Sequence, residues 1–433
     1  MLKAMAQKVM SETVTSGEID LRVADIFNAA FAGIASQEGR FLLNRLDAGR
    51  HGDAPLVAAL VRLAETDDIH LASCITPGSV VIPVALAASA AGDGTRFDRA
   101  VATGYAAGIR LGLAIGGARA MEVGVWPTMV AAPVMAAATA AVMRGGDAAH
   151  MANAMAIALA GRGGRIGRPV GSSTARWLNF ARAVAAGVEA EADAAAGLAG
   201  DVDIVSPAWL SAQSNAGMIA PDVLVADHGP GIADTGYKPF ATARQGAAAI
   251  AAFRQLLDEE GFGADQIDHL LVEVPSASHA MVSRPLNPAD RLSTLSSLGY
   301  QLALAALSPD RLFDAARLDA AAENVLSFAR RVDVRPAPDL DDIWPELWAG
   351  RFTVQVAGRS LRREIKRMDT DAGSPAAEAA VREKFARMSS YRPALVDLSP
   401  GSCSDPDGRA AIWSDLLALC ATRRKELLAD EYH

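Results

Sequence analysis

The 433-residue chain has little cysteine and no excess of positive charge. Its three cysteines, Cys74, Cys403 and Cys420, are too few and too far apart for a disulfide framework, and none belongs to a C-x-x-C pair typical of zinc or redox sites. This usage predicts a cytoplasmic protein, because the reducing cytoplasm disfavours disulfides. The formal net charge of -9 lacks the positive field that binds a phosphate backbone, so we expect no nucleic-acid partner.

Several catalytic signatures are also missing. The sequence contains no H-E-x-x-H, no G-x-x-x-x-G-K-[ST] and no G-x-S-x-G, so it gives no support for a metalloprotease, a P-loop enzyme or an α/β-hydrolase. Most of its histidines stand in no ligand-spaced pattern. These are His150, His228, His269, His279 and His433. The sequence therefore predicts no metal site.

One uncharged run, residues 123–143, is long enough to cross a bilayer. Pro127 and Pro133 interrupt it, and most of its residues are Ala, which gains little from insertion into lipid. We therefore expect a buried helix of a soluble protein and no membrane partner. The N-terminus reaches acidic residues before any continuous apolar stretch develops, so no secretory signal is expected either.

Apolar residues make up 51% of the chain and charged residues 21%, whereas aromatic residues make up only 5%. The chain can therefore bury a large core built mostly from Ala, Leu and Val, which excludes disorder as its main state. At this length a single core usually splits, so we expect two domains of unequal size.

Helical periodicity dominates both ends of the chain, and β-branched runs appear only in the middle. Up to about residue 230, Ala- and Leu-rich segments carry apolar residues at three- and four-residue steps. The β-branched runs occupy residues 269–277 and 351–365, and Gly358 divides the second, which favours a hairpin turn. Beyond Asp371 the helical pattern returns.

This order predicts a mainly α fold with a discontinuous large domain. The large, all-helical domain would be formed by residues 1–233 and 374–433, and a smaller α+β domain, residues 234–373, would be inserted into it. The crevice between the two domains would be the default ligand site.

The densest group of chemical side chains lies between residues 65 and 79. Glu65, Asp67, Asp68 and His70 crowd the end of one predicted helix, and a Pro-Gly turn leads into the next. These groups suit proton transfer or the binding of a polar substrate, and the N-terminus of the following helix suits an anion. A solvated acidic loop explains the same residues equally well.

A second group lies between residues 235 and 246. Lys238 precedes a proline, and Arg244 and Gln245 stand at the start of an amphipathic helix, where two cations and an amide suit a small carboxylate. A partly desolvated lysine can also act as a general base. Taken alone, the group is more typical of a basic surface loop. Tyr300, among apolar residues on a predicted helix, is likewise more typical of a core hydrogen bond.

Five segments of the sequence resemble the MmgE/PrpD family in the same order. They are ETDDIHLASCITPGSVVIPVALAAS at 65–89, GYAAGIRLGLAIG at 104–116, GVWPTMVAAPVMAAATAA at 124–141, YKPFATARQGAAAIAA at 237–252 and LSSLGYQLALAA at 295–306. The first is similar to the family run LDFDDTH followed by HPGS. The resemblance extends from about residue 20 to about residue 390.

The resemblance implies a large helical domain assembled from both chain ends, a smaller α+β lid domain, and a homodimer. It also implies chemistry without a cofactor on a small-molecule carboxylate. In such chemistry a proton α to a carboxylate is removed, and then water is lost, carbon dioxide is lost, or the proton returns on the other face.

The resemblance also implies which residues form the site. Catalytic roles fall on Glu65, Asp68, His70, Lys238 and Tyr300, which are retained or conservatively changed. Apart from the resemblance, our candidates for binding substrate in the expected cleft are Arg176, Arg182, Arg244, Gln245, Thr76 and Trp126. No metal ligand is implied.

The sequence departs from the family pattern at five positions. Thr76 and Trp126 replace histidines, Ile69 replaces a threonine, Ala185 replaces a lysine of the decarboxylase-like members, and Ala247 replaces a further histidine. Because histidine is the usual proton carrier near neutral pH, the family mechanism cannot be copied unaltered.

We therefore predict a cofactor-independent lyase of the dehydratase type, as in 2-methylcitrate dehydratase, acting on a small di- or tricarboxylate. An epimerase of an iminodisuccinate-like dicarboxylate is the alternative, and decarboxylation ranks third. A different class, a non-catalytic carboxylate-binding relative, remains open because of the missing histidines.

Overall fold

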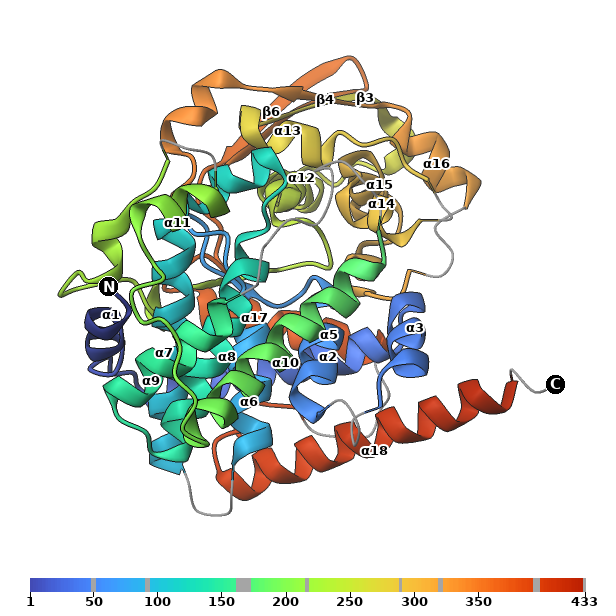
Figure 1. Cartoon of the computed structure of the whole chain (residues 1–433). Coiled ribbons are helices and arrows are strands. Elements are labelled where there is room, and N and C mark those ends of the chain that lie inside the picture. The colour runs from blue at the N-terminus through green and yellow to red at the C-terminus, as the bar shows by residue number, and fades with distance from the viewer. Residues whose placement is uncertain are drawn as a thin grey trace. The chain divides into compact units, whose positions relative to one another are not determined.

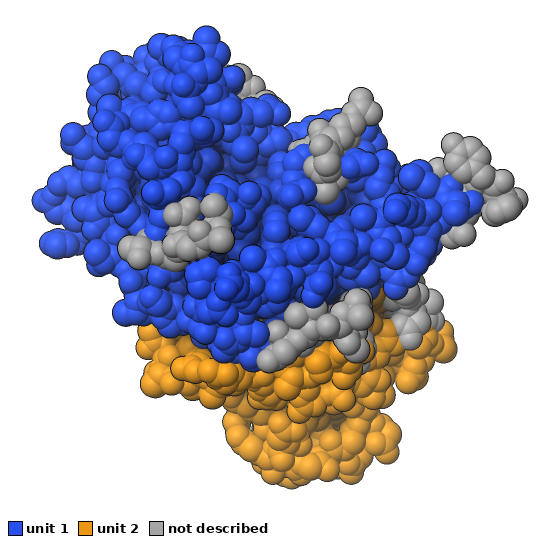
Figure 2. Space-filling model, turned by 90° about the horizontal axis from the view of Figure 1, so that it is seen from below, with its two compact units in different colours: residues 1–169, 173–236, 392–433 blue, residues 170–172, 237–391 orange. Residues whose placement is uncertain are grey.

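The computed structural model describes residues 1–47, 52–89, 94–160, 173–214, 218–287, 290–317, 322–391 and 398–430. The chain divides into two units, coloured separately in Figure 2. Unit 1 consists of residues 1–169, 173–236 and 392–433, and unit 2 of residues 170–172 and 237–391. Both ends of the chain therefore belong to unit 1.

Unit 1 is built mainly from helices, which Figure 1 labels. Its α-helices are α1 (Leu2–Val9), α2 (Ser16–Ile34), α3 (Gln37–Arg45), α5 (Asp53–Ala64), α6 (Gly78–Ala88), α7 (Gly94–Ala114), α8 (Pro127–Arg144), α9 (Ala148–Leu159), α10 (Ala175–Ala195), α11 (Pro207–Gln213) and α18 (Pro406–Asp430). Short 3-10 helices span Gly117–Val123, Pro221–Leu224 and Ile232–Asp234. The strand β1 (Asp68–Ile69) lies in this unit, and β2 (Gly236–Tyr237) is the point at which the chain passes into unit 2.

Local sequence explains how these helices begin. At α2, the Glu18 carboxylate accepts hydrogen bonds from the backbone N–H of Thr15 at 3.3 Å and from its hydroxyl at 2.8 Å. At α9, Asp147 accepts from the backbone N–H of His150 at 2.8 Å. Both arrangements satisfy donors that a helix N-terminus leaves without partners.

Helix α8 lies in the core of unit 1, against α7, α9 and α10. Small side chains allow this packing, because a Cβ added at Gly187 of α10 would lie 2.3 Å from the carbonyl oxygen of Pro133 in α8. Within the described chain, α8 is the one helix long and apolar enough to cross a membrane, but 94% of its residues are buried inside the structure. The predicted buried helix is therefore confirmed.

Unit 2 combines helices with a sheet. Its α-helices are α12 (Arg244–Glu260), α13 (Ser276–Val282), α14 (Arg291–Ser296), α15 (Leu298–Leu307), α16 (Glu323–Ala329) and α17 (Ala377–Met388). Its strands are β3 (Ile267–Val274), β4 (Val332–Pro336), β5 (Gly350–Val356) and β6 (Arg359–Ile365). Short 3-10 helices span Ala264–Gln266, Pro309–Phe313, Pro338–Ile343 and Ser389–Tyr391.

The four strands follow the order β4-β3-β5-β6. Strand β4 is parallel to β3, and the other two pairs are antiparallel. Ala357 and Gly358 join β5 to β6 with φ of 49° and 75°, the positive values that a tight two-residue hairpin turn requires. Helix α12 packs closely on β5. The two backbones approach so closely that a Cβ added at Gly350 would lie 2.4 Å from the backbone nitrogen of Ala249. The hairpin predicted from Gly358 is present.

The predicted fold class needs a correction. The fold is mostly helical, but the expectation of an all-helical large domain is wrong, because unit 1 contains β1 and an isolated bridge between His70 and Ile75. The backbone N–H of His70 donates to the carbonyl of Ile75 at 2.8 Å, which closes a short extended loop after α5. The arrangement of an all-helical domain with a lid is therefore replaced by two units that each combine helices with extended backbone.

Candidate functional site

Asp68 lies at the centre of a buried hydrogen-bonded group in unit 1, which we call the Asp68 cluster (Arg22, Asp68, Gly78 and Tyr105). The Tyr105 hydroxyl donates to Asp68 Oδ2 at 2.5 Å, and the backbone N–H of Gly78 donates to Oδ1 at 3.0 Å. Arg22 Nη1 lies 3.6 Å from Oδ2. A Cβ at Gly78 would lie 2.6 Å from the Tyr105 oxygen, so only glycine allows this approach at the start of α6.

The environment of Asp68 changes its acidity. Burial raises the pKa of its carboxyl from 3.8 to about 6. Arg22 and the hydrogen bond from Tyr105 oppose the rise, and the neighbouring carboxylates Asp67 and Asp25 add to it. The carboxyl of Asp68 therefore changes protonation close to neutral pH, where a proton-transfer group is most effective.

His70 is nearly buried, and its ring is held through one nitrogen. The backbone N–H of Ser73 donates to His70 Nδ1 at 3.2 Å, and Ser73 Oγ lies 2.8 Å from the same atom. Because Nδ1 accepts a backbone N–H, the ring proton resides on Nε2. Burial lowers the pKa of His70 to about 4, although Asp234 opposes this shift. At pH 7 the imidazole is neutral and can donate from Nε2.

Glu65 and Trp126 are both linked to Arg62. Arg62 Nη1 lies 3.0 Å from Glu65 Oε2 and 3.2 Å from Asp67 Oδ1, and its guanidinium carbon lies 5.2 Å from the centroid of the Trp126 ring. Trp126 also stacks on Phe180, with ring centroids 5.5 Å apart. Aromatic packing therefore occupies the position where the family resemblance implies an imidazole.

Thr76 belongs to a chain of hydroxyl groups between the start of α6 and the start of α8. Its backbone N–H donates to Thr128 Oγ1 at 3.2 Å, and its hydroxyl lies 3.4 Å from those of Ser79 and Thr128. Thr128 in turn donates to the carbonyl of Cys74 at 3.1 Å. Thr76 can form hydrogen bonds here, but it cannot replace a histidine as a proton carrier near pH 7.

The two arginines predicted on α10 lie in different environments. Arg176 donates from Nε to the carbonyl of Ser173 at 2.9 Å, and its guanidinium carbon lies 5.9 Å from the ring centroid of Trp177. Arg182 is exposed and donates to Asn179 Oδ1 at 3.4 Å. Their function as carboxylate clamps stays a prediction.

In unit 2, Tyr300 lies beside the buried Arg317, whose charge interacts with that of the buried Arg291, and we call Arg291, Tyr300 and Arg317 the Tyr300 cluster. The guanidinium carbon of Arg317 lies 5.6 Å from the centroid of the Tyr300 ring. Burial lowers the pKa of Arg317 to about 10; Tyr300 raises it and Arg291 lowers it further. Arg317 also has a φ of 49°, a strained value for a non-glycine residue, and such strain is concentrated at functional sites.

The loop from Lys238 to Arg244 is hydrogen-bonded to the elements that carry this cluster. The backbone N–H of Ala243 and the hydroxyl of Thr242 both donate to the carbonyl of Leu295 in α14, at 2.9 Å each. Arg317 donates to the carbonyl of Ala241. The structure therefore brings the Lys238 loop next to the Tyr300 cluster within one unit, and Figure 1 shows α12, α14 and α15 side by side.

Lys238 and Arg244 are both buried, with exposed fractions of 2%. Arg244 pairs with Asp371 through Nη2, but its Nε and Nη1 are buried and have no hydrogen-bond partner among the described residues. Gln245, the next residue of α12, is half-buried. A buried guanidinium with two donors left over is suited to a carboxylate ligand.

Sequence reasoning missed several residues in or beside these two clusters. They are Arg22, Arg62, Tyr105, Arg291 and Arg317. For Arg62 a signal existed, because it is a lone cation in an otherwise apolar helical stretch, and such a cation must find a partner when the helix is buried. For Arg317 the sequence offers no comparable signal.

Comparison with known proteins identifies the family. The MmgE/PrpD N-terminal domain matches residues 22–218, and the MmgE/PrpD C-terminal domain matches residues 240–395. The two matches cover most of the chain, so the protein belongs to the MmgE/PrpD family. This family includes lyases and isomerases. A search of curated proteins finds no match.

Proposed function

We propose that the protein is a cofactor-independent lyase that removes water from a small di- or tricarboxylate after abstraction of a proton α to a carboxylate. Family membership supports a lyase or an isomerase. The observation that supports the proposal best is the excess of buried positive charge in unit 2, where Arg244, Arg291 and Arg317 accompany Lys238 and Tyr300.

The substrate class follows from this charge. Among the described residues of unit 2, the buried carboxylates are Asp314 and Asp371, so the buried cations outnumber them. Arg351 is paired with the less buried Glu273, Asp339 and Glu364, whereas Arg244 keeps two buried N–H groups without a partner among the described residues, which is costly unless a ligand satisfies them. An anion with two or three carboxylates supplies that compensation, and the free donors of Arg244 are proposed to hold one of its carboxylates.

The chemistry then needs a base and an acid. In the proposed reaction the amine of Lys238 takes the α proton, and the C–H electron pair forms the new C=C bond while the C–O bond breaks. The Tyr300 hydroxyl gives its proton to the departing hydroxide, which leaves as water. Arg317, above the Tyr300 ring, stabilises the resulting phenolate. The proton on Lys238 returns to Tyr300 before the next turnover.

An epimerase is the second candidate. Returning a proton to the other face of the same carbon requires no acid for a leaving group. Thr76 and Trp126, which stand where the resemblance implies histidines, lie in a hydroxyl chain and an aromatic stack. Because neither side chain can supply the imidazole acid that elimination would use for its leaving group, these replacements favour epimerisation, which has no leaving group to protonate.

The further expectations belong to the same proposal. A homodimer in the cytoplasm, with a small carboxylate as its substrate and no cofactor, is what the family resemblance and the cysteine usage imply. Size-exclusion chromatography with light scattering measures the oligomeric state directly.

A single experiment separates the candidate functions. The purified protein is incubated in D2O with 2-methylcitrate, citrate, cis-aconitate and the iminodisuccinate stereoisomers, and the C–H signals are followed by NMR. New vinyl signals indicate elimination, exchange without net product indicates epimerisation, and carbon dioxide release indicates decarboxylation. Binding without any of these changes would contradict the proposal and favour a non-catalytic carboxylate-binding protein.

A further inference from the structure

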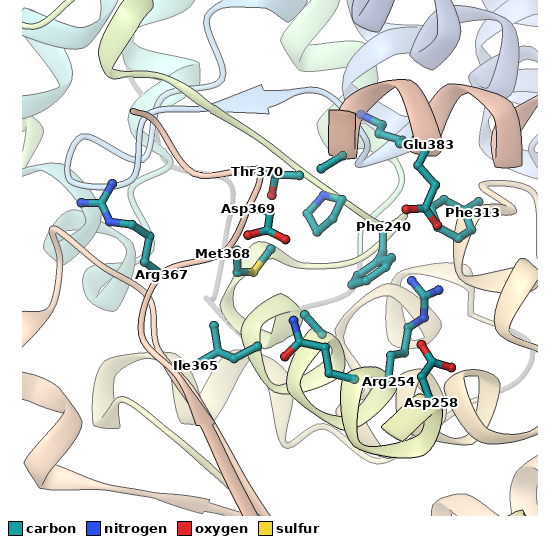
Figure 3. A pocket seen from close by; sticks show the side chains of 15 residues that line it. Phe240, Arg254, Asp258, Phe313, Ile365, Arg367, Met368, Asp369, Thr370 and Glu383 are labelled. Atoms are coloured by element: carbon teal, nitrogen blue, oxygen red, sulfur yellow. The ribbon is translucent and has the colours of Figure 1, made fainter. Parts of the chain in front are cut away.

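A separate pocket of about 250 Å³ lies wholly within unit 2 (Figure 3). Its walls come from the loop after Lys238, helix α12, the chain that follows β6, and helix α17. Among the described residues, no member of the Tyr300 cluster lines it. Pockets for drug-sized ligands measure about 300–1,000 Å³, so this pocket suits a smaller molecule.

Arg254 on α12 is held in this pocket without the use of its N–H groups. Its guanidinium carbon lies 5.5 Å from the ring centroid of Phe240 and 5.9 Å from that of Phe313. Within the described chain it makes no hydrogen bond and no ion pair. Cation–π contacts therefore position the guanidinium and leave its planar donors available for a carboxylate.

Two neighbouring residues, Asp369 and Thr370, lie across the pocket from Arg254 (Figure 3). Thr370 is only 3% exposed, and its buried Oγ1 has no hydrogen-bond partner among the described residues. A buried hydroxyl without a partner destabilises the protein, so a ligand that bonds to it recovers that cost. The carboxylate of Asp369 is exposed and likewise makes no hydrogen bond or ion pair with any described group.

The charges around the pocket balance. Three cations and three carboxylates line it: Arg254, Arg367 and Lys384 against Asp258, Asp369 and Glu383. A simple anion would meet three carboxylates, whereas a zwitterion finds a partner for each of its charges. The remaining wall is apolar, with Phe240, Phe313 and Met368 each no more than 5% exposed.

We propose that this pocket binds a small α-amino acid with an apolar side chain. The carboxylate bonds to Arg254 and to the Thr370 hydroxyl, and the ammonium pairs with Asp369. Asp369 and Thr370 are adjacent in the chain. They can therefore bind the ammonium and the carboxylate, which an α-amino acid carries on the same carbon. The ligand side chain lies against Phe240, Phe313 and Met368. This site is independent of the reaction proposed above.

Isothermal titration calorimetry with three matched probes tests the assignment. L-leucine carries both charges, 4-methylpentanoate lacks the ammonium, and 3-methylbutylamine lacks the carboxylate. We expect L-leucine to bind with a Kd below about 1 mM, and each of the other two to bind at least about tenfold more weakly. No heat from L-leucine up to about 20 mM overturns the proposal, because affinities weaker than that are not those of a built site.

Three substitutions locate the binding. Arg254→Met is expected to weaken L-leucine binding at least about tenfold, and Thr370→Val about threefold without lowering Tm, since its hydroxyl has no internal partner to lose. Asp369→Asn weakens binding of L-leucine but not of 4-methylpentanoate. Arg335→Met, at an exposed ion pair on β4, is the control and leaves affinity unchanged. Equal affinity in all variants, or equal binding of L-leucine and 4-methylpentanoate, overturns the amino-acid assignment.

Discussion

The two units bury charge in opposite proportions. Among the described residues, the buried cations of unit 1 are Arg22, Arg62, Arg110 and Arg409, against the buried carboxylates Asp25, Glu38, Asp67, Asp68 and Glu191. In unit 2 the buried cations are Lys238, Arg244, Arg291, Arg317, Arg351 and Lys384, and the buried carboxylates are Asp314 and Asp371. Unit 1 is therefore close to internal neutrality, whereas in unit 2 the buried cations outnumber the buried carboxylates, and Arg351 is paired with the less buried Glu273, Asp339 and Glu364.

This difference separates two uses of buried polar groups. In the Asp68 cluster the carboxylate receives its hydrogen bonds from protein donors, so the network fixes the turn before α6. In unit 2, Arg244 keeps two buried donors without a described partner, and Arg317 bonds to backbone carbonyls rather than to a carboxylate side chain. A carboxylate whose oxygens accept hydrogen bonds from protein donors stabilises the fold, whereas a guanidinium with two donors left over is suited to a ligand.

The largest effect is expected at Lys238. Lys238→Met keeps the length of the apolar stem but removes the proposed base, and turnover should fall by at least about a thousandfold. The rate of the elimination assay, measured with circular dichroism to show that the fold is intact, checks this. Activity within about tenfold of wild type would remove Lys238 from the mechanism.

The two tyrosines provide a matched pair. Tyr300→Phe removes the proposed acid but keeps the ring under Arg317, so kcat should fall about a hundredfold with little change in Tm. Tyr105→Phe removes the donor to Asp68 and should cost about 1–3 kcal/mol of stability with activity largely retained. Chemical denaturation and the activity assay measure the two effects. If Tyr105→Phe lowered activity and Tyr300→Phe lowered stability instead, the comparison of the two clusters would be contradicted.

A smaller effect is expected at Gly78. Gly78→Ala places a Cβ 2.6 Å from the Tyr105 oxygen and 2.9 Å from both oxygens of Asp68. The cluster must shift to admit it, at a cost of about 2 kcal/mol. Urea denaturation measures the loss. Gly17→Ala, at a helix position where a Cβ would meet no atom within 4 Å, is the control and should not destabilise the protein.

The smallest effect concerns the pH dependence of stability. Because burial raises the pKa of Asp68 to about 6, its contribution to stability is full below its unfolded value of 3.8 and declines as pH rises through 6. Asp68→Asn removes this dependence, so between pH 5 and pH 8 the variant should gain about 1 kcal/mol relative to wild type. Denaturation at both pH values tests this.

The pKa shift of His70 has the opposite sign to that of Asp68, so its contribution to stability depends on pH in the opposite direction. Burial lowers its pKa from 6.5 to about 4, so its contribution is present above pH 6.5 and is lost as pH falls toward 4. If the relative stability of Asp68→Asn fell between pH 5 and pH 8, the assignment of the raised pKa to Asp68 would be wrong.

The parts of the fold that follow from local patterns were predictable. The helices of unit 1 follow from apolar residues at helical spacing, and the β5–β6 hairpin follows from alternation around Gly358. The short strand β1 did not follow, because two residues carry no periodicity and form a strand only by pairing with β2, a segment far away in the chain. That single feature made the all-helical prediction for the large domain wrong.

Only those residues of the candidate site that belong to the family motifs were predictable from the sequence. These motifs named Asp68, Lys238 and Tyr300, but not the partners that determine their chemistry. Tyr105 lies 37 residues from Asp68 in the chain. The burial that raises the pKa of the Asp68 carboxyl is a property of the packed helices. Long-range contacts of this kind leave no trace in local sequence.

The hydrogen bonds of the loop from Lys238 to Arg244 have a consequence for motion. The backbone N–H groups of Ala241 and Ala243 donate to the carbonyls of Leu312 and Leu295, at 2.9 Å each. Amides bonded in this way exchange with solvent only when the elements around them open together. Hydrogen–deuterium exchange at these two amides should therefore be as slow as in the strands of the sheet. The segment that presents Lys238 then opens only with the unfolding of unit 2.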